Sequence, residues 1–495
     1  MSSNHLLSKT TFLRSVQCHK SLYLNRYKPA LRDPPDPSQE AVFRTGKEVH
    51  ALARELFPGG VVASSAESYD PKTWLRKTRT LMGEGVGVLF EAAFEHDQVL
   101  VVVDILERVG AKWKAFEVKS STSVKDPYDW DVAVQYHILT NAGIELDDFS
   151  VLHIDNNYVR HGDLDLEALF TSVSMLELVK EMGPEVSIHI EEAKAVLSEP
   201  NVPEIDIGPY CDEPYACDFM GYCWRHIPDH SVFTVTRMKK DHKFGLYHDG
   251  IMRMEDIPED FPLNKISRVH VEGHKFGRSI IDQVALQAVL GSLKYPLYFL
   301  DFETYNPAIP PFDRTKPYGQ IPFQYSLHRK ASLEGELSHT GFLAETGIDP
   351  RPPLIESLLR DTPPPGDILA YNRSFEARVL RDLADAFPES ASEIEDLSSR
   401  LVDLMEPFQK RYYYLPEMDG SYSIKAVLPA LVPELSYEIL EISEGTQAME
   451  AYYQLGIETN PSIIDRIRND LWEYCKFDTL AMVRILEKLE ALMEQ

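Results

Sequence analysis

The sequence predicts an α/β protein with two domains. The chain has 495 residues, more than one hydrophobic core usually serves, and this length suits two or three domains. Up to about residue 230 the pattern runs helix, strands, helix; from Lys294 it changes to strands followed by alternating helices and strands. Both orders are typical of α/β cores. We therefore expect one domain over 1–230, a connector with some structure of its own over 231–290, and a second domain over 291–495.

The predicted elements of the first domain are two helices around a set of strands. Residues 39–57 follow a Pro-rich segment and have the apolar spacing of an amphipathic helix. Residues 87–108 and 113–118 are rich in Val, Phe and Ile, which favours successive strands. A second helix is expected over 129–141.

The predicted second domain opens with a short apolar strand at 294–305 that contains two carboxylates near its end. Apolar alternation predicts further strands, and longer apolar periods predict helices between them. In chain order we expect strands at 321–329 and 337–344, a helix at 352–361, a strand at 367–372, a helix at 374–387 and helices from Pro461 onward.

The formal net charge of −28 argues against a protein that coats nucleic acid through a basic surface. It does not exclude a nuclease, because clustered carboxylates that bind divalent cations add negative charge. Any groove for nucleic acid must then be a local basic feature. No apolar run approaches the roughly 18 residues needed to span a bilayer, and the first residues lack a secretory pattern. We expect a cytoplasmic protein without a membrane span.

Several acidic residues of the second domain fall at element ends. Asp301 and Glu303 are two apart at the end of a strand, so they share one face. Glu376 lies at a predicted strand-to-helix junction, and Tyr474 and Asp478 are four apart on a predicted helix. Two-metal phosphoryl chemistry needs such carboxylates to hold ions roughly 3.5–4 Å apart. A tyrosine one turn before the last carboxylate could orient the attacking water.

This series, Asp-x-Glu, Tyr-Asn-x-x-Phe-Glu and Tyr-x-x-x-Asp, resembles the exonuclease motifs of the DEDD superfamily, tyrosine subclass, over about residues 295–495. The resemblance implies a ribonuclease H-like core and Mg²⁺ or Mn²⁺ ions. Its catalytic residues would be Asp301, Glu303, Glu376, Tyr474 and Asp478, with the four carboxylates as metal ligands. Glu376 departs from the pattern, which usually has Asp, and Asp403 is an alternative ligand. Asn372 is expected to fix the junction rather than to bind metal.

The first domain carries a second constellation. Asp104 lies late in one predicted strand, and Glu117 and Lys119 share a face of the next. A hairpin would bring the three together, so that two acids hold a divalent ion and the ammonium polarises water or phosphate. Gln135 follows on the next helix, and His50 lies on the helix upstream.

This set resembles the PD-(D/E)xK nucleases of the RecB-like branch, including CRISPR-associated exonucleases. The resemblance implies a restriction-endonuclease-like core, metal ligation by His50, Asp104 and Glu117, and catalytic roles for Lys119 and Gln135. Val103 stands where the motif has Pro, and Leu139 replaces the tyrosine that follows the branch's glutamine by four positions. Glu91 either belongs to the site or faces solvent.

Five cysteines in a chain expected to be cytoplasmic argue against a disulfide framework. One cysteine precedes the predicted core and three follow it: Cys18, then Cys211, Cys217 and Cys223. This order resembles that of RecB-like nucleases in which an iron–sulfur cluster staples the domain. A 4Fe–4S cluster is the favoured ligand. Zinc, with His19 or His226 as further ligands, and unligated core cysteines remain alternatives. Cys475 is expected to be a buried core residue.

Both halves in this order resemble an uncharacterised bacterial family that fuses a RecB-like nuclease, with a cysteine cluster, to a DEDD-type domain. The resemblance implies a divalent-metal-dependent exonuclease or endonuclease that acts in DNA repair or mobile-element defence. Single-stranded DNA is the favoured substrate and single-stranded RNA the alternative. A second hypothesis is that one domain has lost catalysis and binds nucleic acid. A third is a scaffold that recruits partners through its cluster.

Overall fold

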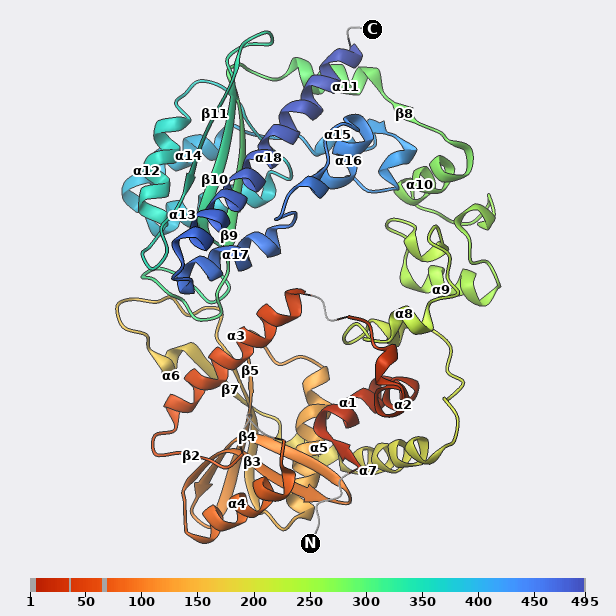
Figure 1. Ribbon diagram of the computed structural model, residues 1–495, viewed down its shortest axis with the longest axis vertical. Coiled ribbons are helices and arrows are strands. Elements are labelled where there is room, and N and C mark those ends of the chain that lie inside the picture. Colours follow the sequence, from red (N-terminus) through yellow and green to blue (C-terminus); the bar gives the residue numbers. More distant parts are fainter. Residues whose placement is uncertain (1–5, 35–36, 65–68, 494–495) are drawn as a thin grey trace. The chain divides into compact units, whose positions relative to one another are not determined.

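The structure is a computed structural model that describes residues 6–34, 37–64 and 69–493. The chain divides into two compact units (Figure 1). Unit 1 comprises Met1–His226 together with Pro307–Tyr318, and unit 2 comprises Ile227–Asn306 together with Gly319–Gln495. The chain therefore leaves unit 2 once, adds a short segment to unit 1, and returns. Residues 231–290, the expected connector, lie within unit 2.

The described residues of unit 1 form a seven-stranded sheet in the order β2-β3-β4-β5-β6-β7, with β1 paired to β4. Strands β3, β4 and β5 are antiparallel neighbours, β5 and β6 are parallel, and β7 is antiparallel to β6. The strands are β1 (Leu7–Ser8), β2 (Val61–Val62), β3 (Val88–His96), β4 (Val99–Val109), β5 (Lys112–Lys119), β6 (Leu146–Ile154) and β7 (Phe170–Ser174). The predicted strands at 87–108 and 113–118 are β3, β4 and β5.

Helices cover both faces of this sheet (Figure 1). On one face, Val101 and Val103 pack with apolar residues of α5 and α7. On the other, Ile105 and Val118 pack against Val49 of α3. The helices are α1 (Lys9–Gln17), α2 (His19–Tyr27), α3 (Pro37–Ala53), α4 (Pro71–Gly83), α5 (Pro127–Asn141), α6 (Leu166–Leu169), α7 (Leu176–Ser198) and α8 (Met220–Cys223). This arrangement confirms the α/β class for unit 1.

The segment Pro307–Tyr318 completes the second face. Ala308 is buried in the same apolar cluster as Val49. The guanidinium of Arg160 donates to the carbonyls of Pro310 and Pro311, each at 3.0 Å. The Tyr318 hydroxyl donates to the carbonyl of Ser120. Both apolar and polar contacts thus fix the segment to unit 1. Its contact residue Ser120 directly follows Lys119 at the end of β5.

Unit 2 is built on a five-stranded sheet of described residues in the order β11-β10-β9-β12-β13. Strand β10 is antiparallel to both β9 and β11, whereas β9, β12 and β13 are parallel. The strands are β9 (Leu297–Tyr305), β10 (Ile321–Lys330), β11 (Leu337–Leu343), β12 (Ile368–Ala370) and β13 (Leu401–Asp403), with β8 (Ile280–Ile281) and β14 (Tyr413–Tyr414) forming a separate pair. The strands predicted for this region are therefore present.

Alternation along β9 decides which side chains face which helices. Tyr298 and Leu300 pack with residues of α12 and α13, whereas Leu297 and Phe299 pack in a cluster with α18. Asp301 and Glu303 continue the second set, since successive side chains of a strand alternate. Both carboxylates therefore face the α18 side of the sheet.

A single helix, α18 (Pro461–Met493), replaces the several helices expected from Pro461 onward. It runs along β9 and β10 (Figure 1). The other helices of unit 2 are α9 (Lys240–His248), α10 (Lys265–Phe276), α11 (Gln283–Gly291), α12 (Arg351–Asp361), α13 (Ser374–Ala386), α14 (Ala391–Ser399), α15 (Glu406–Gln409), α16 (Ile424–Leu431) and α17 (Gly445–Ile457). Unit 2 is thus also α/β.

Residues 231–290 have a small apolar core of their own. Val232, Val235 and Leu246 are buried together with Met254 and Val271, which joins α9 to α10. Within the described ranges, none of the helices combines the length and the apolar character that crossing a membrane requires.

Candidate active sites

The first candidate site lies in unit 2, on the α18 side of β9. Asp301 and Glu303 come from β9, and Tyr474 and Asp478 come from α18. These four residues line one open pocket of about 500 Å³. Glu376, in the first turn of α13, is 2% exposed, and its charge helps to raise the pKa of Asp301. The fold therefore brings together the five residues that the sequence singled out in this half.

The carboxylates of this pocket disfavour each other's charge. Burial, followed by the charges of Asp478 and Glu303, raises the pKa of Asp301 well above its ordinary value. Burial raises the pKa of Asp478 to about 6, and burial with a contribution from Asp403 raises that of Glu376 to about 8. Oε2 of Glu376 is buried and has no hydrogen-bond partner among the described residues. Clustered carboxylates with an unsatisfied buried oxygen are suited to hold divalent cations.

Three further residues join this site, two of them from segments without a recognisable motif. Tyr437 donates a hydrogen bond of 2.5 Å from its hydroxyl to Oδ1 of Asp478. Lys425, exposed at the start of α16, lines the pocket, and its charge lowers the pKa values of Glu303 and Asp478. Cys475 is buried as expected, and its Sγ lies 3.7 Å from Oδ2 of Asp301. Only the fold could place Lys425 and Tyr437 here, because no spacing in the sequence links them to the carboxylates.

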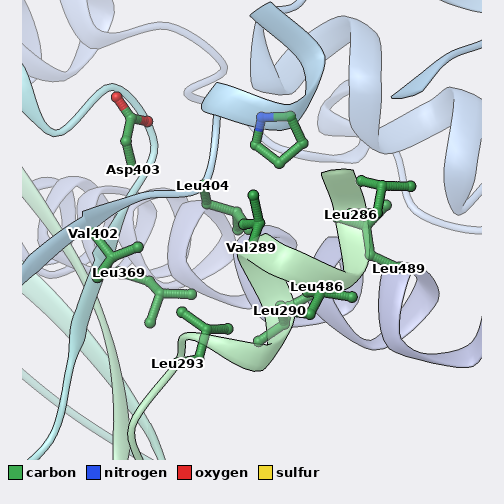
Figure 2. Close-up of a pocket in the computed structure, with 11 residues that line it drawn as sticks. Leu286, Val289, Leu290, Leu293, Leu369, Val402, Asp403, Leu404, Leu486 and Leu489 are labelled. Atoms are coloured by element: carbon green, nitrogen blue, oxygen red, sulfur yellow. The ribbon is translucent and has the colours of Figure 1, made fainter. Parts of the chain in front are cut away.

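The alternative ligand Asp403 has a structural role. Its Oδ1 accepts hydrogen bonds from the backbone N–H groups of Asn372, at 3.1 Å, and Met405, at 2.9 Å. Figure 2 shows Asp403 at the edge of a small apolar pocket, apart from the leucine side chains that line it. Asn372 has a φ of +72°, in the left-handed region that asparagine tolerates better than most residues. These contacts set the turn from β12 into α13, where Glu376 sits.

Metal-free unit 2 is expected to lose stability as the pH rises from about 5 to about 8. A carboxyl group whose pKa is raised by folding stabilises the fold at low pH, and this contribution disappears through the folded pKa, about 6 for Asp478 and about 8 for Glu376. A bound divalent cation should reverse the trend, adding about 2.7 kcal/mol at a concentration of 100 times its Kd. Urea unfolding at pH 6 and pH 8, in EDTA and in Mn²⁺, measures this effect.

The matched variant for this experiment is Glu376→Gln, which cannot ionise. In EDTA its unfolding free energy should fall less between pH 6 and pH 8 than that of the wild type. Parallel pH profiles for wild type and variant, with and without Mn²⁺, would contradict a cation site built on Glu376.

The second candidate site, in unit 1, contains a closed set of ion pairs. Lys9 Nζ lies 2.7 Å from Oε1 of Glu117 and 3.1 Å from Oδ1 of Asp131. Lys119 Nζ lies 2.8 Å from the same Glu117 oxygen and pairs with the other oxygen of Asp131. Gln135 donates from Nε2 to Oε2 of Glu117 at 2.8 Å and to Oδ1 of Asp131 at 3.0 Å. Two ammonium groups therefore face two buried carboxylates.

Beside this set lies a group of potential metal ligands. His50 Nδ1 is 3.7 Å from Oδ1 of Asp104, and ligand atoms of His50, Glu91 and Asp104 all lie within 4.8 Å of one another. Oδ2 of Asp104 accepts from the Val118 N–H at 2.8 Å. Glu91 in β3 has a φ of +54° and is paired with Arg54 at 2.6 Å. Glu91 therefore belongs to this group of side chains and does not simply face solvent.

In unit 1, the surroundings favour the neutral form of Asp104 and the ionised form of Glu117. Burial, followed by the charge of Glu117, raises the pKa of Asp104 well above its ordinary value. Burial also disfavours the charge of Glu117, but Lys119 and Lys9 outweigh it and lower the pKa of Glu117. For Lys119 too, the opposing carboxylates outweigh burial, and its pKa is raised. Glu117 is therefore held as a carboxylate, whereas at Asp104 the charge of Lys9 does not outweigh burial and the charge of Glu117.

Sequence reasoning missed Lys9 and Asp131. Asp131 precedes Gln135 by four residues on α5, so helical spacing could have pointed to it. Lys9 begins α1 directly after Ser8, whose side chain caps that helix, and nothing local connects Lys9 to Glu117, 108 positions later. Leu139 is fully buried in the core.

The four cysteines named from the sequence line one small pocket of unit 1, together with Lys20 and Tyr210. Cys18 joins α1 to α2, Cys211 and Cys217 lie in the loop after α7, and Cys223 ends α8. Burial raises the pKa values of the Cys18 and Cys223 thiols, and nearby cysteines add to the effect. Bound metal is the usual means of holding such thiols as thiolates.

The spacing of the sulfurs bears on the size of the group they fit. Among these four described cysteines, no three sulfur atoms all lie within 4.8 Å of one another. A single zinc ion with Zn–S bonds of about 2.3 Å would bring four thiolates to roughly 3.8 Å apart. A cluster separates its thiolates more, because each binds a different iron.

Comparison with known proteins identifies relatives but no activity. Residues 298–423, which include Asp301, Glu303 and Glu376, match a family described as Domain of unknown function (DUF2779). The chain is 25% identical over 266 residues to an uncharacterised protein of Mycoplasma pneumoniae, covering 48% of this chain and 38% of that protein. It is 24% identical over 352 residues to an uncharacterised protein of Ureaplasma parvum, covering 64% of this chain and 49% of that protein. The matched regions span less than half the length of either relative.

Proposed function

We propose that this protein is a divalent-metal-dependent nuclease with one active site in each unit. The observation that carries the proposal is that each unit gathers acidic side chains from separate segments of the chain into one site. In unit 2 these are Asp301, Glu303, Glu376 and Asp478, and in unit 1 they are Asp104 and Glu117, with His50 and Lys119. An ordinary fold avoids such clusters, because buried like charges destabilise it.

The topologies support the finer assignments. The order β11-β10-β9-β12-β13, with the carboxylates on the central strand, is the order expected of a ribonuclease H-like DEDD exonuclease core. In unit 1, the hairpin β4–β5 followed by α5 and the parallel strand β6 is expected of a PD-(D/E)xK core of the RecB-like branch. We assign the two units to these classes.

In unit 2, the four carboxylates would hold Mg²⁺ or Mn²⁺. Bound divalent ions activate water and stabilise the leaving oxygen of a phosphodiester. The chain supplies the rest: Tyr474, one turn from Asp478, is placed to orient the attacking water, and Tyr437 fixes Asp478 through its hydrogen bond. Lys425 offers an ammonium group at the pocket wall for a substrate phosphate. By analogy with its class, this site would trim from a 3′ end.

In unit 1, His50, Asp104 and Glu117 would hold a divalent ion, with Glu91 beside them. Lys119 would stabilise charge on the phosphate, and Gln135 and Lys9 would hold Glu117 in place. Single-stranded DNA is the favoured substrate and RNA the alternative, in repair or in defence against mobile elements. A 4Fe–4S cluster on Cys18, Cys211, Cys217 and Cys223 would staple the unit, and reduced thiols suit a cytoplasmic location.

One observation favours a second candidate function for unit 1. Both oxygens of Glu117 are already engaged, Oε1 by two lysines and Oε2 by Gln135. If these contacts persist with substrate, Glu117 cannot serve as a metal ligand. Unit 1 would then bind nucleic acid for unit 2 without cutting it.

An assay with end-labelled single-stranded DNA and RNA tests the proposal. Purified protein with its cysteine pocket loaded is incubated with substrates labelled at the 5′ or the 3′ end, in Mn²⁺ or in EDTA. We expect cleavage in Mn²⁺ only, with mononucleotides released from the 3′ label by unit 2 and a second product pattern from unit 1. Cleavage that persists in EDTA, or its complete absence in Mn²⁺, would contradict the proposed function.

A further inference from the structure

We propose that His19, His189 and Glu192 form a zinc-class metal site in unit 1. It is separate from both carboxylate sites and from the cysteine pocket, and it does not depend on the proposed nuclease function. His19 is the first residue of α2, and His189 and Glu192 lie one turn apart on α7. The three side chains meet where α2 packs against α7.

The distances between the donor atoms are those of a coordination site. Oε2 of Glu192 lies 3.4 Å from Nδ1 of His189 and 4.0 Å from Nε2 of His19, and ligand atoms of all three residues fall within 4.8 Å of one another. Tetrahedral zinc with bonds of about 2.0–2.1 Å separates neighbouring ligand atoms by roughly 3.4 Å. The His189–Glu192 pair already has this separation, and His19 would have to move closer to complete the set.

His189 supplies the second observation. Its Nδ1 is buried and forms no hydrogen bond with the described residues, although the Glu192 carboxylate lies 3.4 Å away as an ion-pair partner. A bound ion would satisfy this nitrogen. The His189 ring packs edge-on against Trp130, with centroids 4.8 Å apart, so its orientation is fixed by packing. The unsatisfied nitrogen and the Glu192 carboxylate therefore face the same point.

The donor set defines the class of ion. Two imidazoles and one carboxylate are the ligands of open zinc sites, in which water takes the fourth position. The Glu192 side chain is 48% exposed, which leaves access for the ion and for that water. Imidazole donors favour zinc and similar transition metals over Mg²⁺. This site would consequently select a different ion from the carboxylate sites.

A simple ion pair accounts for only part of the arrangement. His189 and Glu192 are three residues apart on one helix, a spacing at which such pairs are common on helix surfaces. That spacing does not explain His19, which comes from another helix and follows Cys18 directly. An ion at this point would tie the start of α2 to α7 and so stiffen the backbone beside Cys18. The site would serve as a second staple of unit 1.

Titration of the full-length protein with Co²⁺, as a visible reporter for zinc, tests this proposal. All proteins in this titration carry Asp104→Ala, which removes a ligand of the other site that contains a histidine. The cysteine pocket is loaded beforehand, and excess Mg²⁺ fills the carboxylate site of unit 2. Cobalt bound by imidazole and carboxylate gives weak visible bands, whereas cobalt bound by the cysteines gives intense thiolate charge-transfer absorption. The variants are His189→Gln and Glu192→Gln, and His161→Gln is the control because His161 is an exposed histidine outside the cluster. Circular dichroism establishes that each variant is folded.

We expect the wild type to bind one equivalent of Co²⁺ with weak visible bands only, and zinc to displace it. Each of the two ligand variants should bind more than about tenfold more weakly, since even loss of an outer-shell partner typically costs that much. The control should match the wild type. Unchanged binding in folded His189→Gln and Glu192→Gln proteins, or wild-type binding seen only as thiolate charge transfer, overturns the proposal.

Discussion

The Asp301→Asn substitution is expected to abolish hydrolysis by unit 2 while leaving the metal-free protein more stable. Asp301 shares one face of β9 with Glu303 and lies within the field of Asp478. Replacing its carboxylate removes a metal ligand, and even second-shell changes cost about 10–100-fold, so we expect a loss of at least about 100-fold. The same change removes a repelling charge, because the pKa of Asp301 is raised well above its ordinary value.

Rate and stability are measured in an Asp104→Ala background, which silences unit 1. The release of 3′-labelled nucleotides in Mn²⁺ reports the rate, and urea unfolding in EDTA at pH 8 reports the stability. The unfolding free energy of the Asp301→Asn protein should exceed that of its parent by at least about 1 kcal/mol, somewhat less than the equivalent of one pKa unit. Asp465→Asn, an exposed aspartate near the start of α18, is the matched control and should change neither quantity. An active Asp301→Asn protein would remove Asp301 from the site.

The Lys9→Met substitution is expected to destabilise unit 1 and to impair its activity. Lys9 balances Glu117 and Asp131 together with Lys119. Without it, two buried carboxylates share one ammonium group, and breaking a buried ion pair costs about 3–5 kcal/mol. The Lys9 side chain keeps 22% of its surface exposed, so we expect the lower end of that range, about 3 kcal/mol.

A double-mutant cycle separates this pairing from general loss of packing. Adding Asp131→Asn to Lys9→Met restores the balance of charge, so the double variant should lose less stability than the sum of the single variants. Lys72→Met, at an exposed lysine of α4, is the control for removing a charge from unit 1. Activity of unit 1 should fall at least about tenfold in Lys9→Met, as expected for a residue that positions a ligand. Additive losses in the cycle, or a loss below about 1 kcal/mol, would count against the role given to Lys9.

The parts of the sites that could be predicted from the sequence are those fixed by local geometry. Asp301 and Glu303 share a face because strand side chains alternate, and Tyr474 and Asp478 share one because a helix turns every 3.6 residues. Glu117 and Lys119 follow the first of these rules. The structure then places each pair beside the partners that the resemblances implied.

The missing parts depend on contacts between distant segments. Lys9 and Tyr437 each contact a carboxylate, and Lys425 lines the pocket of two others, from elements whose local sequence shows no motif. The segment Pro307–Tyr318 carries no regular period, and only its burial and its hydrogen bonds to Arg160 and Ser120 assign it to unit 1. In the proposed zinc-class site, His19 is likewise far in sequence from its partners His189 and Glu192. Such long-range pairings lie beyond what periodicity can predict.

We have proposed that each unit carries an independent metal-dependent site for phosphodiester hydrolysis. The residual activity of the Asp104→Ala/Asp301→Ala double variant, measured beside the two single variants on single-stranded DNA and RNA in Mn²⁺, tests both sites at once. We expect each single variant to lose one product pattern and keep the other, and the folded double variant to cut nothing. A double variant that cuts as fast as the wild type would contradict both site assignments.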